Sequence, residues 1–75
     1  MNKELLKTRI KETTGSKAML DELQRLLDLS ANSLVAKTNG RREFKPSEID
    51  AIRREYRLTP EDVIEIFIKQ EEPKK

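Results

Sequence analysis

The chain of 75 residues contains no cysteine and no histidine. These two absences exclude a disulfide framework, a zinc finger and nucleophiles that depend on a thiol or an imidazole. An enzyme would have to rely on carboxylates, lysine or a hydroxyl group, and no such group stands in a recognisable catalytic pattern. We therefore expect no catalysis, no metal, no cofactor and no small-molecule substrate.

Glycine, aromatic residues and long apolar runs are also scarce. Two glycines cannot build a glycine-rich phosphate loop, and one tyrosine with two phenylalanines cannot form a stacking platform for single-stranded nucleic acid. No apolar run approaches the ~20 residues that span a membrane, and no signal-peptide core follows Met1. The sequence thus predicts an intracellular protein without membrane contact.

Charged residues are abundant, at 40% of the chain, but the net charge is only +2. So small a net charge does not by itself indicate a nucleic-acid partner, and the distribution of charge matters more. The body of the chain is mildly basic, whereas residues 58–75 carry more acidic than basic side chains. We expect one small domain over residues 1–69 and a disordered charged tail over residues 70–75.

The most informative stretch is residues 23–34, which predicts two short helices joined by a tight turn. Leu23, Leu26 and Leu27 recur at helical spacing. Ser30 can cap a second helix that buries Leu34. This pattern is typical of a helix-turn-helix, whose second helix lies in the major groove of DNA. No acidic residue occurs from position 29 to position 42, which is compatible with a phosphate partner.

Local signals place the other helix ends. Asn2 is a suitable cap for a first helix that ends near Gly15, with Leu6 and Ile10 on its inner face. Ser16 is predicted to cap the second helix, which ends at Asp28. The third helix should run over residues 31–38, with Asn39-Gly40 as its stop.

Two proline-initiated helices complete the predicted all-α, five-helix fold. Pro46 stands at a first helical position, and Thr59-Pro60-Glu61-Asp62 combines a cap, a proline and a carboxylate. The apolar residues that follow are Val63, Ile64, Ile66, Phe67 and Ile68. Val63, Ile64 and Phe67 can close the core. Alternatively, Ile66 or Ile68 remains for a partner subunit, which makes the segment Ile66, Phe67 and Ile68 a candidate dimer interface.

Several of these motifs together resemble the small CI/Cro-type repressors of phages, within the xenobiotic-response-element-like helix-turn-helix family. The features are Asn2-Lys3-Glu4-Leu5-Leu6, the loop Asn39-Gly40-Arg41-Arg42-Glu43-Phe44, Ser47-Glu48-Ile49 and Leu58-Thr59-Pro60-Glu61. The resemblance covers residues 3–68 and is nearest to Cro-like regulators of Gram-positive temperate phages. It implies a lambda repressor-like domain that binds a double-stranded DNA operator, in the cytoplasm of a bacterial host, within a lysis–lysogeny switch.

The resemblance also implies a set of DNA-contacting residues. The first turn of the recognition helix would face the bases, and the next exposed turn and the following loop would face bases and phosphates. A further anion site would lie at the start of the second helix. The residues concerned are Ser16, Lys17, Ala31, Asn32, Ser33, Val35, Ala36, Lys37, Asn39, Arg41 and Arg42.

Asn32 is the best candidate for a base contact, because asparagine can bond adenine with two hydrogen bonds. It can equally serve only as a short polar residue that favours the helix start. With Lys37 as its one basic residue, the helix is weakly equipped for a monomer, so a homodimer reading two half-sites is expected.

The chain departs from the family pattern in the second helix and the turn. Leu20, Gln24 and Asp28 stand where the family usually has glutamine, a small residue and glycine. These departures leave open an alternative function. Some relatives of this size act as antirepressors, which bind a companion CI-type repressor and block its DNA binding.

Overall fold

The computed structural model describes residues 1–68, in which all regular secondary structure is helical and no strand occurs, which confirms the all-α prediction. Its elements are α1 (Lys3–Thr14), α2 (Met19–Leu27), α3 (Ala31–Thr38), α4 (Pro46–Glu55) and α5 (Pro60–Val63), which continues as a π-helical segment, η1 (Ile64–Ile68). None of the helices within residues 1–68 is long and apolar enough to cross a membrane. The predicted disordered tail, 70–75, lies outside the described residues.

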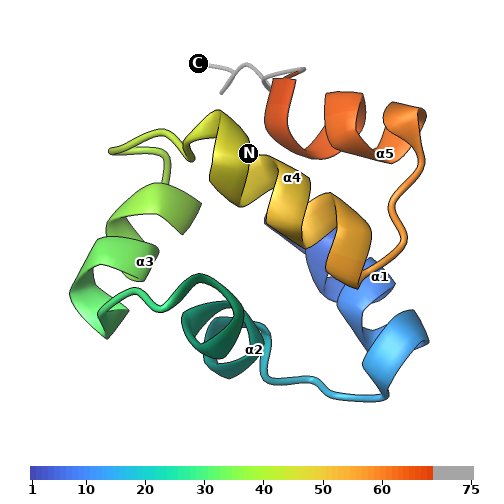
Figure 1. Cartoon of the computed structure of the whole chain (residues 1–75), viewed down its shortest axis with the longest axis horizontal. Coiled ribbons are helices and arrows are strands. Elements are labelled where there is room, and N and C mark those ends of the chain that lie inside the picture. Colours follow the sequence, from blue (N-terminus) through green and yellow to red (C-terminus); the bar gives the residue numbers. More distant parts are fainter. Residues whose placement is uncertain (69–75) are drawn as a thin grey trace.

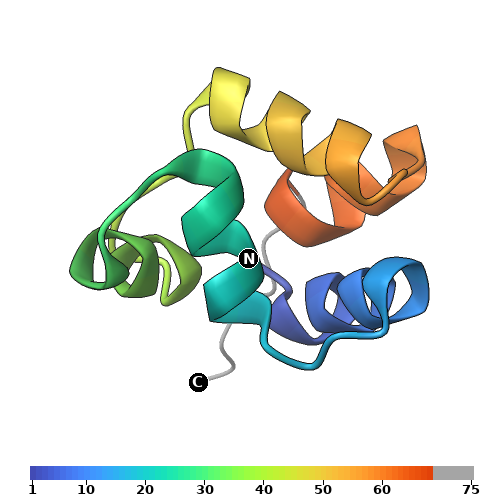
Figure 2. The same ribbon diagram turned by 60° about the horizontal axis from the view of Figure 1, so that its bottom comes forward.

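The helices surround one core, with α3 at one end of the molecule. Figure 1 shows α4 across the middle, α1 behind it, and α2 and α3 together on one side. The turned view of Figure 2 shows α1 and α3 on opposite sides of α2. Contacts join α2 to both α3 and α4, and α1 to η1. The position of α3 at the end of the molecule leaves its first turn open to solvent.

Side chains cap the starts of α1, α3 and α5, as their sequence signals predicted. Asn2 Oδ1 accepts from the Leu5 backbone N–H at 3.1 Å. Thr59 Oγ1 accepts from the Asp62 N–H at 3.0 Å, and Asp62 Oδ2 accepts from the Thr59 N–H at 3.1 Å. Each cap satisfies a backbone donor that the first turn of a helix leaves without a partner.

Residues in the left-handed conformation follow the C-terminal ends of both α2 and α3. Gly40 has φ 85° after α3, as the Asn-Gly signal predicted. Asp28 has φ 56° at the end of α2, where a glycine is the less strained residue. Aspartate tolerates this conformation better than most side chains, so the departure from glycine at this position is compatible with a tight turn.

The core combines apolar side chains from every helix with one buried phenol. Its members are Leu6, Ile10, Met19, Leu23, Leu34, Phe44, Ile52, Tyr56, Leu58 and Ile66. The Tyr56 hydroxyl donates to Glu22 Oε1 at 3.2 Å and joins α4 to α2. Burial, followed by the negative charge of Glu22 beside it, raises the pKa of Tyr56, so the phenol stays neutral.

The C-terminal segment buries Ile66, one of the two residues expected to remain for a partner, and exposes Ile64, which was expected in the core. Ile66 is fully buried, and its carbonyl accepts from the Asn2 backbone N–H at 2.9 Å, so it is unavailable to a second chain. Ile64 is exposed and does not close the core. Val63, Ile66 and Phe67 share the inward face at helical spacing, whereas Ile64 and Ile68 lie one turn apart on the outer face.

Leu34 is the one residue of α3 that lies in the hydrophobic core, and its side chain is 0% exposed. We predict that Leu34→Ala lowers the free energy of unfolding by about 2–4 kcal/mol, because it removes buried methyl groups and leaves a cavity. Thermal denaturation followed by circular dichroism measures this change. Leu20→Ala, the same truncation at an exposed position of α2, should cost under about 0.5 kcal/mol. Equal losses in the two variants would contradict the role of Leu34 as the anchor of α3.

Candidate nucleic-acid interface

The start of α3 projects an open edge into solvent. Ser30 caps the helix, and its Oγ accepts from the Ser33 backbone N–H at 3.2 Å. Ala31 and Asn32 are exposed and Ser33 is half-buried, while Leu34 lies behind them in the core. The three residues predicted to face bases therefore stand together at the outer edge of the molecule.

Lys37 lies elsewhere than the resemblance implied. Its side chain is only 5% exposed, and its Nζ donates to Glu48 Oε1 of α4 at 2.7 Å. Position 37 falls one turn after Leu34, on the inner face of a short helix, and this spacing was the signal that could have placed it. Lys37 therefore neutralises a carboxylate inside the protein and cannot contact a phosphate from this position.

The other residues of that turn are also less open than expected. Val35 and Ala36 are half-buried, which leaves only part of each side chain for a thymine methyl group. Because Lys37 faces inward, α3 itself presents no cation. Any phosphate contact must come from the segments around the helix.

The loop after α3 supplies two such cations. Arg41 and Arg42 are exposed, and neither takes part in an ion pair with a residue of the described chain. Their backbone N–H groups both donate to the Ala36 carbonyl, at 2.9 and 3.2 Å, so the loop is held against the end of α3. Asn39, also exposed, ends the helix just before them. These three predicted residues lie together, as expected.

The start of α2 differs in detail from its prediction. The helix begins at Met19 with Ala18 at its cap position, so Ser16 is not the capping residue. Ser16 instead shapes the preceding turn: its Oγ accepts from the Ala18 N–H, and its own N–H donates to Thr14 Oγ1, both at 3.0 Å. The serine satisfied a local donor two residues away, which sequence could not separate from a helix cap. Lys17 is exposed beside it.

Two lysines of α1 extend the basic surface and were missed by sequence reasoning. Lys3 and Lys7 lie one turn apart and, with Lys17 and the first turn of α2, line a shallow cleft of about 400 Å³. Lys3 Nζ also donates to Asn39 Oδ1 at 3.2 Å. The spacing of the two lysines was readable, but nothing in the sequence places α1 against the end of α3.

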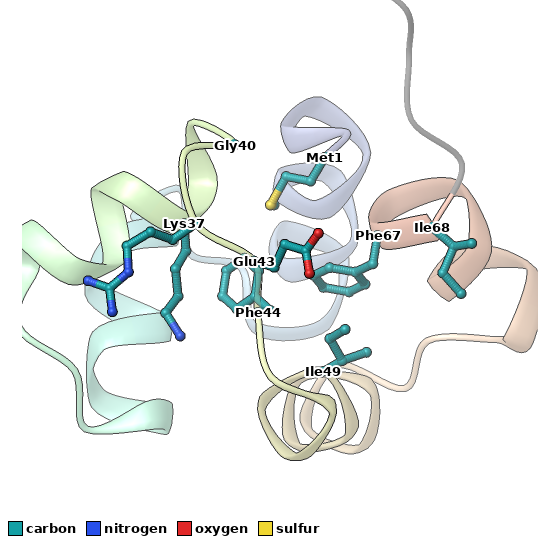
Figure 3. Close-up of a pocket in the computed structure, with 9 residues that line it drawn as sticks. Met1, Lys37, Gly40, Glu43, Phe44, Ile49, Phe67 and Ile68 are labelled. Atoms are coloured by element: carbon teal, nitrogen blue, oxygen red, sulfur yellow. The ribbon is translucent and has the colours of Figure 1, made fainter.

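A second surface, near the C-terminal helix, combines apolar and charged side chains. A cleft of about 500 Å³ is lined by Met1, Lys37, Gly40, Arg42, Glu43, Phe44, Ile49, Phe67 and Ile68. Figure 3 shows the Phe44 and Phe67 rings between Met1 and Ile49. The rings meet edge to face, with centroids 5.5 Å apart. Phe67 is half-buried and Ile68 is 63% exposed, so of the three residues predicted to meet a partner these two remain accessible.

Comparisons of the chain with protein-family models, with curated proteins and with solved structures found no match. The resemblance to CI/Cro-type regulators therefore stays a prediction. Within residues 1–68, no three aspartate, glutamate, histidine or cysteine residues come together as metal ligands. Function has to be inferred from the exposed start of α3, the basic residues around it and the cleft that contains Phe44 and Phe67.

The buried ion pair gives the protein a defined response to acid. Burial raises the pKa of the Glu48 carboxyl. Hydrogen bonds from Lys37 and from the Lys45 backbone N–H, together with the positive charges of both residues, lower the pKa by more than burial raises it. The pKa thus lies below its ordinary value of 4.5. The stabilisation is complete above pH 4.5 and is lost as the pH falls through the lowered pKa, because protonation then removes the charge of the pair.

We predict that Glu48→Gln lowers the free energy of unfolding at pH 7 by about 3 kcal/mol, because Lys37 is left buried without a counter-charge. The variant should also lose part of the decline in stability below pH 4.5 that the native protein shows. Urea denaturation at a series of pH values measures both effects. Glu55→Gln, an exposed position of the same helix, is the control and should behave as the native chain. Parallel pH profiles for Glu48→Gln and the native chain would contradict the prediction.

Proposed function

We propose that this protein is a regulator of transcription that binds duplex DNA through a helix-turn-helix formed by α2, the turn 28–30 and α3. The observation that carries the proposal is the exposed start of α3, where Ala31 and Asn32 face solvent while Leu34 anchors the opposite side. The absence of carboxylates from position 29 to position 42 supports the same function. With the resemblance to CI/Cro-type regulators, these features favour an operator of a phage lysis–lysogeny switch.

In the proposed complex, the start of α3 enters the major groove. The Asn32 amide can donate to N7 and accept from N6 of an adenine, and Ala31 can touch a thymine methyl group. Arg41 and Arg42 stand on the loop beside the helix, where they can neutralise phosphates. Lys17 offers a further charge near the start of α2. Base contacts give this arrangement its sequence preference, and the cations give it affinity.

A single copy presents few cations and one candidate base-reading side chain, so the proposal includes a homodimer. Dimers of helix-turn-helix proteins read half-sites that lie about 34 Å apart along the duplex. The longest dimension of this chain is 34 Å, so two adjacent copies can reach such half-sites. The exposed Ile68 and the cleft beside it, which contains Phe44 and Phe67, offer a surface on which the second copy can pack.

The proposal is tested by selecting a preferred sequence from a randomised duplex library with the purified full chain. Fluorescence anisotropy then compares the selected duplex with a scrambled duplex of equal composition and length. We expect the selected duplex to bind at least a hundredfold more tightly at the same salt concentration. Equal affinity for both duplexes would reject sequence-specific regulation.

Asn32 provides a sharper test of the reading edge. We predict that Asn32→Ala weakens binding to the selected duplex by about 1–3 kcal/mol and relaxes the preference at one base pair, because the amide is lost. Repeating the duplex selection with the variant measures the preference. Ser47→Ala, an exposed polar truncation at the start of α4, is the control and should leave both quantities unchanged. An unaltered preference in Asn32→Ala would mean that Asn32 serves only the helix start.

A second candidate function, the antirepressor, is favoured by the exposed isoleucines of the C-terminal segment and the inward-facing Lys37. Ile68 and Ile64 leave an apolar surface in solvent that DNA binding does not use. In this alternative, the surface grips the DNA-binding domain of a companion repressor and prevents operator binding.

The two functions are separated by mixing the chain with a CI-type repressor encoded beside it and following size-exclusion chromatography. For an antirepressor we predict a one-to-one complex that Ile68→Ser weakens and Asn32→Ala leaves intact, because only the former removes apolar contact area. For a DNA-binding regulator we predict a homodimer of the chain alone that Ile68→Ser dissociates, with no mixed complex. A monomer that forms neither complex would contradict the assignment of the cleft as an interface.

A further inference from the structure

We propose that Lys3 and Asn39 together form a phosphate clamp, which grips a phosphodiester of the DNA backbone at the C-terminal end of α3. The inference deepens the proposed function and rests on it, since the ligand is the backbone of the duplex that α3 would enter. It assigns to α1 a part in DNA binding that neither the sequence motifs nor the resemblance indicated.

The clamp joins two residues that are 36 positions apart in the chain. Lys3 is the first residue of α1, and Asn39 is the residue that ends α3. The Lys3 ammonium donates to Asn39 Oδ1 at 3.2 Å, and both side chains are exposed. This bond takes one of the two lone pairs of the amide oxygen, so the pair presents mostly hydrogen-bond donors to solvent: the amide NH2 and the remaining ammonium hydrogens. A positively charged cluster of donors is suited to phosphate oxygens.

The surroundings of the clamp are basic and come from three segments. Lys7 follows Lys3 by one turn, Lys17 lies across the cleft at the start of α2, and Arg41 and Arg42 follow Asn39 along the loop. None of these five cations forms an ion pair with a residue of the described chain. Glu4 and Asp21 line the same cleft and offset part of its positive charge.

The length of α3 places the clamp at the right distance from the reading edge. Eight residues at 1.5 Å per residue extend about 12 Å, which is also about the width of the major groove. When Ala31 and Asn32 lie against the bases, the end of α3 therefore reaches a backbone that borders the groove. The clamp compensates for the inward-facing Lys37, the cation that α3 itself withholds.

A purely structural explanation of the same contact exists, and it makes the opposite prediction for one substitution. A lysine at the C-terminal end of α3 stabilises the helix through its dipole. If that were its only role, Lys3→Gln would lower the melting temperature and leave the salt dependence of DNA binding unchanged. If the pair is a phosphate clamp, Lys3→Gln also removes one phosphate contact, and the carboxylate in Asn39→Asp neutralises Lys3 and repels the phosphate.

The test measures the affinity of the full chain for a selected duplex and a scrambled duplex by fluorescence anisotropy across a range of salt concentrations. We expect Asn39→Asp to bind both duplexes at least tenfold more weakly at low salt, with a melting temperature equal to or above that of the native chain. Lys3→Gln should make the negative slope of log K against log salt less steep by about 0.9, the effect of one lost phosphate contact. Arg57→Asn removes one positive charge from the loop between α4 and α5, far from α3 in Figure 1, and should leave the slope unchanged.

The outcomes separate the clamp from the proposed function. Native affinity in Asn39→Asp, or a native salt slope in Lys3→Gln, would overturn the clamp and leave sequence-specific regulation standing. Equal affinity of the native chain for the two duplexes would reject the proposed function, while the salt slopes on either duplex would still decide for or against the clamp. Failure of the native chain to bind either duplex would overturn both.

Discussion

The ion pair between Lys37 and Glu48 sets the orientation of α3, and the candidate interface depends on that orientation. The 2.7 Å contact ties the inner face of α3 to the first turn of α4, where Glu48 also accepts from the Lys45 N–H at 2.8 Å. The Lys37 ammonium lies 5.8 Å from the centre of the Phe44 ring. A rotation of α3 about its axis would separate these buried charges at considerable cost. Ala31 and Asn32 are consequently held on the outer edge.

The same pair explains why the basic residues of the candidate interface lie around α3 and not on it. A short helix has one inner and one outer face, and here the inner face takes the only cation. Arg41 and Arg42 of the loop, Lys17 before α2 and Lys3 of α1 remain on the surface. In the proposed DNA complex, base reading at the start of α3 is thus separate from backbone binding, which several segments share.

The loop after α3 belongs to both surfaces of the molecule. Arg42 is one of the cations near α3, and it also lines the cleft that contains Phe67 and Ile68. A protein partner seated in that cleft would contact the same loop that is proposed to meet DNA. If both proposed partners bind as described, the shared loop would couple protein binding to DNA binding.

Local rules in the sequence determined where most helices begin and end and which side of α3 is anchored. Caps at Asn2 and Thr59, the stop at Gly40 and the spacing around Leu34 act within four residues, so they were readable without coordinates. The spacing of Lys37 after Leu34 indicated its inner face, but only the tertiary structure paired it with Glu48, buried Ile66 and not Ile64, and brought Lys3 to Asn39. Each of those outcomes depends on contacts between different segments of the chain, and such contacts have no local signature.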